Sequence, residues 1–189
     1  MEWVAKRLGF AKRLGELRFK QWMNKNAAEV LLQVGIGTGQ TVLDFGCGSG
    51  TYTIPAARLV GEDGLVYALD ISKTALEKVE KKAKLEGLEN TVTITSVEGE
   101  VIPLKDEIVD HVLLIDVLQD IADKSALLDE VRRALKSNGF ATIFPMHLNS
   151  KAVKNLAVEK GFALEQVLRE RILVFRKPGD TKRAPPAAF

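Results

Sequence analysis

Short apolar runs alternate with helical patterns from residue 41 onward, and this alternation most constrains the fold of the 189-residue chain. The apolar runs have the length of buried strands, and turn residues separate them from the helical patterns. Strands are expected over residues 41–45, 65–70, 92–97, 109–117, 140–146, 163–169 and 172–176. Helices are expected over residues 52–60, 73–86, 124–136 and from 149 or 150 to 161. The order predicts an α/β fold: a doubly wound, mostly parallel seven-stranded sheet with helices on both faces and a closing antiparallel hairpin.

Residues that cap helices mark the ends of several expected helices. Ser72 is a good N-cap for the helix over 73–86, and Gly87 is suited to end it. Asn149 or Ser150 is suited to begin the last helix. The stretch Ser137–Gly139 predicts the end of the helix over 124–136, because Asn and Gly tolerate the left-handed conformation of a C-cap.

The chain divides into three parts by pattern. In residues 1–35, Trp3, Phe10, Leu14 and Leu17 recur at helical spacing, which predicts one amphipathic helix or two. We expect these residues to form a cap or lid, and residues 36–177 to form the main domain. Residues 178–189 contain a Pro-Pro pair and no apolar pattern, and they are expected to be a flexible tail.

The charge is unevenly distributed along the chain. The net charge is +2, but residues 1–26 and 176–189 are both basic, so the body between them is acidic. Basic ends are typical of contact with nucleic acid or an anionic membrane surface, and equally of solvated faces. Charge alone therefore leaves a nucleic-acid partner open.

Composition excludes several classes of protein. The lone Cys47 excludes an internal disulfide. No metal site is expected, because the two histidines, His111 and His147, lie far apart in the sequence. No apolar run approaches the length of a membrane span, and Lys6 and Arg7 interrupt any signal-peptide pattern. A cytoplasmic protein is the expectation.

Three alternate glycines, Gly46, Gly48 and Gly50, follow the first strand and precede a helix. Glycine lets the chain turn sharply and lets a ligand lie against the backbone, and the helix N-terminus offers free N–H donors. Asp70 ends the second strand, where its carboxylate can accept two hydrogen bonds from a ribose diol. A dinucleotide fingerprint would need a third glycine at position 51, which is Thr51.

The pattern Asp-x-Gly-x-Gly-x-Gly over 44–50 instead resembles motif I of the class I S-adenosylmethionine-dependent methyltransferases, in their small-molecule, quinone-type branch. Three further segments are similar to that family in the same order: 64–72, 98–104 and 133–139. The paired runs over 163–177 resemble its closing hairpin. The resemblance implies a Rossmann-like fold, methyltransferase activity and S-adenosylmethionine as cofactor, with S-adenosylhomocysteine as product.

The resemblance also implies which residues hold the cofactor. Asp70 would hold the ribose, Glu100 would accept the adenine amino group with Glu98 as a competitor, and Ile71 and Val101 would sandwich the adenine. Asp44 would order the loop or meet the amino-acid end of the cofactor. The cofactor-binding set is Asp44, Gly46, Cys47, Gly48, Gly50, Asp70, Ile71, Glu100, Val101 and Asp116.

The acceptor side is less clearly encoded. Asp116 and His147 follow the fourth and fifth strands and are the candidate catalytic residues, because the acceptor would sit on that rim. A small-molecule acceptor is expected, such as a quinone or lipid precursor. The alternatives are an RNA or protein acceptor reached through the basic ends, a non-catalytic cofactor-binding subunit, and an NAD-binding domain. The amphipathic N-terminus could also form a homodimer surface.

Overall fold

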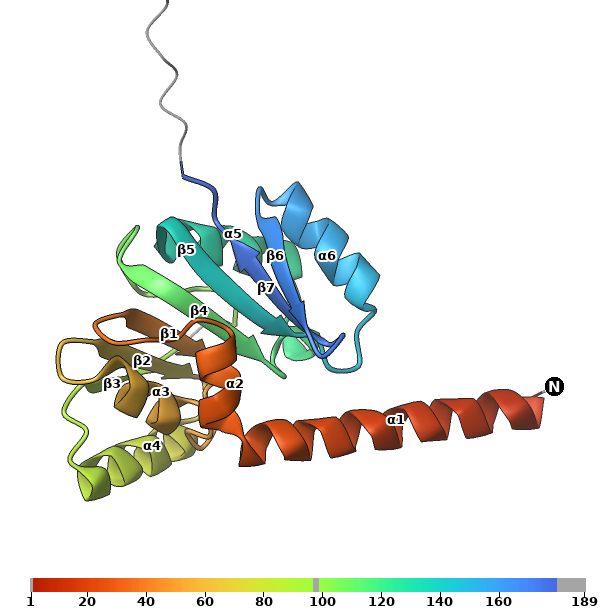
Figure 1. The fold of residues 1–189 in the computed structure, drawn as a ribbon, viewed down its shortest axis with the longest axis horizontal. Coiled ribbons are helices and arrows are strands. Elements are labelled where there is room, and N and C mark those ends of the chain that lie inside the picture. Colours follow the sequence, from red (N-terminus) through yellow and green to blue (C-terminus); the bar gives the residue numbers. More distant parts are fainter. Residues whose placement is uncertain (1, 97–98, 180–189) are drawn as a thin grey trace, which may run out of the picture.

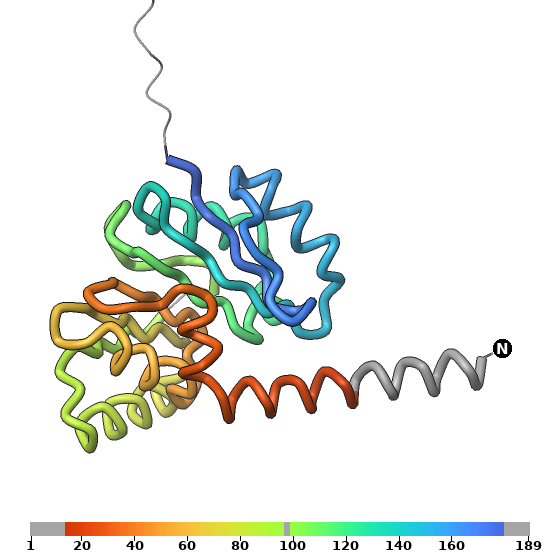
Figure 2. The backbone as a smooth tube through the Cα atoms, viewed as in Figure 1, coloured from red at the N-terminus to blue at the C-terminus, as the bar shows by residue number. Residues whose placement is uncertain are grey.

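The computed structural model describes residues 2–96 and 99–179, except for the side chains of residues 2–13 (Figure 2). Its strands form one seven-stranded sheet in the order β3-β2-β1-β4-β5-β7-β6 (Figure 1). The first five are parallel, and β7 runs antiparallel to both β5 and β6. The strands are β1 (Thr41–Phe45), β2 (Leu65–Asp70), β3 (Thr91–Thr95), β4 (Val109–Ile115), β5 (Leu135–Phe144), β6 (Ala163–Leu168) and β7 (Ile172–Arg176). The predicted fold class is thereby confirmed.

Six α-helices and one short 3-10 turn belong to the described part of the chain. They are α1 (Glu2–Lys25), α2 (Ala27–Gln33), α3 (Thr53–Val60), α4 (Lys73–Glu86), the 3-10 turn Leu118–Asp120, α5 (Lys124–Ala134) and α6 (Ser150–Glu159). The expected N-terminal helices are thus α1 and α2, and α1 is continuous through Gly9 and Gly15. No helix within residues 2–96 and 99–179 is long and apolar enough to cross a membrane.

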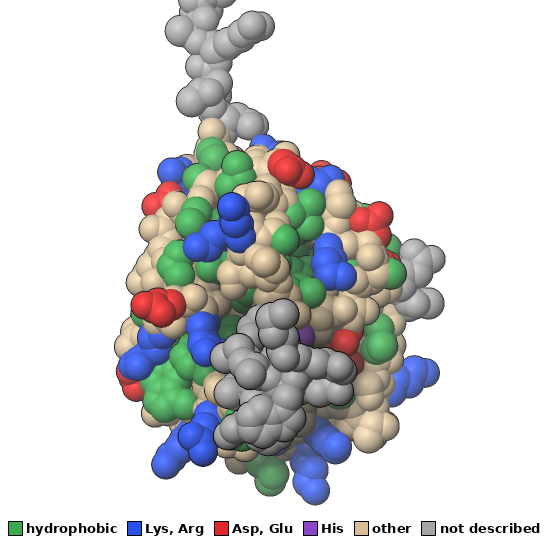
Figure 3. All heavy atoms as spheres, turned by 90° about the vertical axis from the view of Figure 1, so that its right-hand side faces the viewer, with side chains coloured by type: hydrophobic (Ala, Val, Ile, Leu, Met, Phe, Trp, Pro, Cys, Tyr) green, Lys and Arg blue, Asp and Glu red, His purple; other side chains and the backbone are tan. Residues whose placement is uncertain are grey.

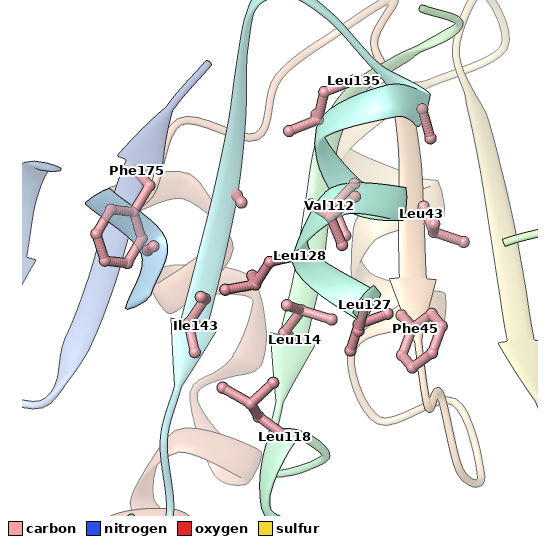
Figure 4. Close-up of a cluster of buried hydrophobic side chains, with 14 of the residues drawn as sticks. Leu43, Phe45, Val112, Leu114, Leu118, Leu127, Leu128, Leu135, Ile143 and Phe175 are labelled. Carbon is pink, nitrogen blue, oxygen red and sulfur yellow. The ribbon is translucent and has the colours of Figure 1, made fainter. Parts of the chain in front are cut away.

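Alternation along the strands divides the core between the two faces of the sheet. In β4, Val112 and Leu114 face a cluster that includes Leu127 and Leu128 of α5 (Figure 4). Their neighbour Leu113 belongs to a second cluster, which is formed largely with α2 and α3. Successive side chains of a strand point to opposite faces, so an unbroken apolar strand buries both.

The predicted caps are correct at two helices and wrong at a third. Ser72 Oγ accepts the Ala75 N–H, and Asn149 Oδ1 accepts two N–H groups of α6. The helix α5, however, ends at Ala134 and not at 137–139. Leu135 is buried and already extended, because it pairs with Val109 as the first residue of β5.

Gly139 has a different role from the predicted C-cap. A Cβ at this position would lie 3.0 Å from the Asp110 carbonyl oxygen. The glycine therefore permits the close approach of β5 to β4, where the register between these strands shifts.

His111 lies inside β4 and is wholly buried. Its Nε2 is 2.8 Å from Thr142 Oγ1, and burial lowers its pKa to about 3. A neutral imidazole enclosed in the sheet has a structural role, as the sequence suggested. The expected flexible tail lies almost entirely outside the described residues.

Candidate cofactor and acceptor site

The glycine loop between β1 and α3 is held against the loop that follows β4. Gly46, Gly48 and Gly50 all have positive φ. A Cβ on Gly46 would lie 2.5 Å from Val117 Cγ2, so only glycine fits between the two loops. The N–H groups of Gly46 and Cys47 both donate to the Leu69 carbonyl oxygen, which fixes the loop to the end of β2.

Asp70 is held in place by two backbone donors. Its Oδ2 accepts the Gly48 N–H and its Oδ1 accepts the Ser72 N–H, both at 2.8 Å. A carboxylate can accept about four hydrogen bonds, so two further donors, such as the hydroxyls of a diol, can still be accommodated. The second strand thus ends in an oriented carboxylate beside the glycine loop.

A cavity of about 270 Å³ opens at the carboxyl ends of β1, β2 and β4. Ligands of parallel sheets bind at this edge, near the switch in strand order between β1 and β4. Four predicted site residues line it: Gly46, Asp70, Ile71 and Asp116. Ile71 is 70% exposed, so an apolar side chain is available to cover a flat ligand. The other lining residues are Phe45, Leu69, Ser96, Gly99, Val117, Asp120 and Ile121.

The remaining predicted cofactor residues do not line this cavity. Asp44 is buried beneath the glycine loop. Cys47 and Gly50 are buried parts of the loop itself, and Cys47 packs with Leu76 and Val79.

Glu100 and Val101 do not line the cavity either. Glu100 Oε1 accepts the Asp123 N–H at 3.1 Å, so one oxygen of the predicted adenine acceptor faces the start of α5. Its competitor Glu98 lies outside the described residues. Ile121, which the sequence analysis did not predict, contributes an apolar side chain to the lining, and Val101 does not.

Asp44 is an acid that the fold holds away from water. It is buried beneath the loop, and its Oδ2 accepts a 2.6 Å hydrogen bond from Thr53 Oγ1. Burial raises its pKa to about 6, with a further contribution from the nearby Asp70 carboxylate, against the opposing effect of Thr53. Its place in the structure supports the alternative in which it orders the loop.

The raised pKa of Asp44 predicts a pH-dependent effect of Asp44→Asn on stability. The folded state binds this proton more tightly than the unfolded state, whose pKa is 3.8. The resulting stability is fully present below pH 3.8 and is lost as the pH rises through about 6. Asparagine never ionises. The free energy of unfolding of the variant, relative to that of the wild type, should therefore rise by about 3 kcal/mol between acid and neutral pH.

Urea unfolding of both proteins across this range measures the difference in their free energies of unfolding. Other titrating groups, including His111, are common to both proteins and cancel. A difference that stays constant with pH would contradict the burial argument.

Asp116 is held at the rim of the cavity by contacts on several sides. Its backbone adopts φ +56°, which is uncommon for a residue other than glycine. Gln119 Nε2 donates to its carbonyl oxygen at 2.8 Å and to its Oδ1 at 2.9 Å. Lys20 of α1 forms an ion pair with its Oδ2. A strained, fixed conformation of this kind is typical of functional sites.

One face of α1 carries polar contacts across the carboxyl edge of the sheet. Glu16 Oε2 lies 3.0 Å from His147 Nδ1, and Asn24 Oδ1 accepts a 2.9 Å hydrogen bond from the Tyr52 hydroxyl. Lys20, between them, binds Asp116. Spacing of four residues places these three side chains on one helix face. The sequence contained this spacing, but nothing in it identified the partners.

The matched family agrees with this geometry. Residues 36–177 match a family described as a methyltransferase domain. The chain belongs to this methyltransferase family. The match confirms the resemblance to class I S-adenosylmethionine-dependent methyltransferases that the motifs indicated.

Two curated relatives and one solved structure illustrate the similarity. The demethylmenaquinone methyltransferase of Geobacillus stearothermophilus is 32% identical over 111 residues, covering 59% of this chain and 47% of the relative. The ubiquinone/menaquinone biosynthesis C-methyltransferase UbiE of Marinomonas sp. (strain MWYL1) is 32% identical over 107 residues, covering 57% and 43%. The chain thus covers less than half of these relatives. A SAM dependent methyltransferase from Aquifex aeolicus superposes with a TM-score of 0.72 at 25% identity, covering 80% of this chain and 88% of the other.

The residues at the cavity fit S-adenosylmethionine. The oriented Asp70 carboxylate suits the ribose hydroxyls, and Ile71 and Ile121 offer apolar faces to the adenine. The lack of a side chain at Gly46 lets the loop pack against Val117, so that the loop backbone itself forms part of the cavity wall. Asp116 lines the same cavity.

Proposed function

We propose that the chain transfers the methyl group of S-adenosylmethionine to a small molecule of the quinone type, by in-line displacement. The observation that carries this proposal is the Asp70 carboxylate, which is fixed by Gly48 and Ser72 at the mouth of the glycine-loop cavity. The names of the two relatives support the acceptor class, since both concern quinone biosynthesis. RNA or protein acceptors and a non-catalytic role have no such support among them.

Each part of the chain then has a defined task. The bound cofactor supplies a methyl group activated by its positively charged sulfur. The glycine loop and Asp70 hold the cofactor in one orientation, and alignment of the methyl with the acceptor provides much of the rate enhancement. The second half of α1, whose Lys20 pairs with Asp116 at the rim of the cavity, would act as a lid that excludes water from the cofactor.

Two side chains on the acceptor side can handle a proton. Because His147 Nδ1 faces Glu16, the other ring nitrogen, Nε2, remains available to take a proton from an acceptor hydroxyl. Glu16 positions the imidazole in the way that a buried carboxylate orients a catalytic histidine. Asp116, at the junction of cofactor and acceptor, is the second candidate for this task.

The activity can be tested with the purified full chain. Incubation with S-adenosylmethionine labelled in its methyl carbon, together with reduced demethylmenaquinone, should give a labelled product by mass spectrometry. His147→Gln should slow the turnover about 100-fold or more, as expected on loss of a general base, with little change in cofactor affinity. Lack of labelled product, despite normal cofactor binding, would refute the quinone-type acceptor.

A further inference from the structure

A second cavity lies beside the cofactor cavity, at the carboxyl end of β5. It has a volume of about 310 Å³ and is lined by residues of α1, the β5–α6 loop, the start of α6 and the β6–β7 turn. The lining residues are Glu16, Phe144, Pro145, Met146, Leu148, Asn149, Ser150, Lys151 and Arg171.

The two cavities adjoin at the ends of neighbouring strands. Phe144, in the second cavity, is the register partner of Ile115 in β4, and its carbonyl oxygen accepts the Asp116 N–H at 3.3 Å. Asp116 in turn lines the cofactor cavity. The two linings are therefore in contact through Phe144 and Asp116, and a molecule in the second cavity would lie at the strand end next to the cofactor cavity.

The walls of this cavity combine apolar surface with positive charge. Phe144, Pro145, Met146 and Leu148 supply the apolar side. The cations are Arg171 and Lys151, and neither forms an ion pair with a carboxylate in the part of the chain that the structure describes. Figure 3, which faces the side of α1, shows Lys and Arg side chains exposed on this side of the molecule.

The lining also contains one carboxylate, Glu16, but His147 engages it at 3.0 Å. The two unpaired cations outnumber it, so the lining remains positive. Water-filled apolar cavities with unpaired cations favour ligands that are apolar in the body and anionic at one end.

The position of Arg171 is built into the fold. Its guanidinium carbon lies 5.2 Å from the centroid of the Phe19 ring of α1, a cation–π contact. The turn that precedes it has positive φ at both Arg169 and Glu170, a conformation that non-glycine residues seldom adopt. The neighbouring Arg169 lies 4.0 Å from the Trp22 ring centroid. The turn thus directs two arginines toward α1, and Arg171 is the one that reaches the cavity.

We propose that this second cavity binds the methyl acceptor, and that the acceptor is an apolar ring carrying an anionic group, such as a carboxylate. Arg171 and Lys151 bind the anion, and the apolar wall contacts the ring. The proposal rests on the proposed function and narrows it to quinone-type rings that carry an acidic group, which the cavity should bind more tightly than a neutral quinol.

The experiment compares two probes that share a naphthalene ring, 2-naphthoate with an anionic carboxylate and 2-naphthalenemethanol with a neutral hydroxymethyl group. Isothermal titration measures the binding of each probe to the full chain with S-adenosylhomocysteine present. We expect 2-naphthoate to bind about tenfold more tightly, as is usual for a charge-assisted hydrogen bond. The variant Arg171→Gln should remove this preference and leave the affinity for the alcohol unchanged.

Two further variants keep the test decisive. Lys151 belongs to α6 and does not depend on the β6–β7 turn, and Lys151→Gln should weaken only naphthoate binding. Lys154→Gln is the matched control, because Lys154 lies one turn along α6 outside the cavity lining. Equal binding of both probes, or an unchanged preference in Arg171→Gln and Lys151→Gln, would overturn the proposal. Titration of S-adenosylhomocysteine alone and the methyl-transfer assay separate these outcomes from failure of the proposed function, which would appear as absence of cofactor binding or of labelled product in the wild type.

Discussion

Replacing Asp70 by alanine is expected to weaken S-adenosylmethionine binding about 100-fold or more, because hydrogen bonds to a charged group contribute about 1.5–3 kcal/mol each and the ribose would lose two. The change also leaves the Gly48 and Ser72 N–H groups without their acceptor, which loosens the glycine loop. Thermal unfolding measures the effect. A cofactor concentration of about 100 times the wild-type Kd stabilises by roughly 2.7 kcal/mol, which raises Tm by about 5–10 °C in a protein of this size. Asp70→Ala should show almost none of this shift.

A second carboxylate at the other end of β2 provides the control for Asp70. Asp63 is exposed and precedes the strand, at the edge of the sheet opposite the cavity. Asp63→Ala should therefore retain the full shift in Tm. S-adenosylhomocysteine should also stabilise the wild type, whereas NAD and ATP should not. Retention of the shift in Asp70→Ala, or stabilisation by NAD alone, would show that the cavity holds a different ligand.

The cofactor side of the site was predictable because its signals are local. The glycines at 46, 48 and 50 immediately follow a strand, and Asp70 ends the next strand. Strand periodicity and the rule that ligands bind at the carboxyl ends of parallel strands then place these residues together. The same kind of local signal correctly predicted Ser72 as an N-cap.

The acceptor side was less predictable because its contacts join distant parts of the chain. Glu16 and His147 are 131 positions apart, and Lys20 and Asp116 are 96 apart. Only the contact of α1 with the carboxyl edge of the sheet brings these pairs together, and no short pattern encodes it. Glu100 failed to line the cavity for a related reason, since a hydrogen bond from the Asp123 backbone holds its carboxylate. The end of α5 was misplaced because strand pairing of Leu135 outweighed the local turn residues.

The close contact between the glycine loop and Val117 predicts that Gly46→Ala is the most destabilising small substitution in the loop. The added methyl would lie 2.5 Å from Val117 Cγ2 and 2.9 Å from Val117 Cβ, and the backbone has φ +72°. Overpacking and left-handed strain should together cost about 2–5 kcal/mol of the free energy of unfolding, as measured by urea denaturation. The variant should also lose cofactor binding, because the loop must move away from the cavity.

Gly48 separates the two causes of this cost. It has φ +53°, but a Cβ there would meet nothing within 4 Å, so Gly48→Ala should cost only the backbone strain, about 1–2 kcal/mol. Val117→Ala removes Cγ2, the nearest of the colliding atoms, and leaves Cβ in place. The double variant with Gly46→Ala should therefore be more stable than the sum of the single effects by about 1 kcal/mol or more. Simple additivity of the two substitutions would mean that the loops are not in the contact described, and the cavity wall at Gly46 would have to be placed elsewhere. Coupling between them, with cofactor binding partly restored in the double variant, would establish that the packing of these two loops shapes the cofactor cavity.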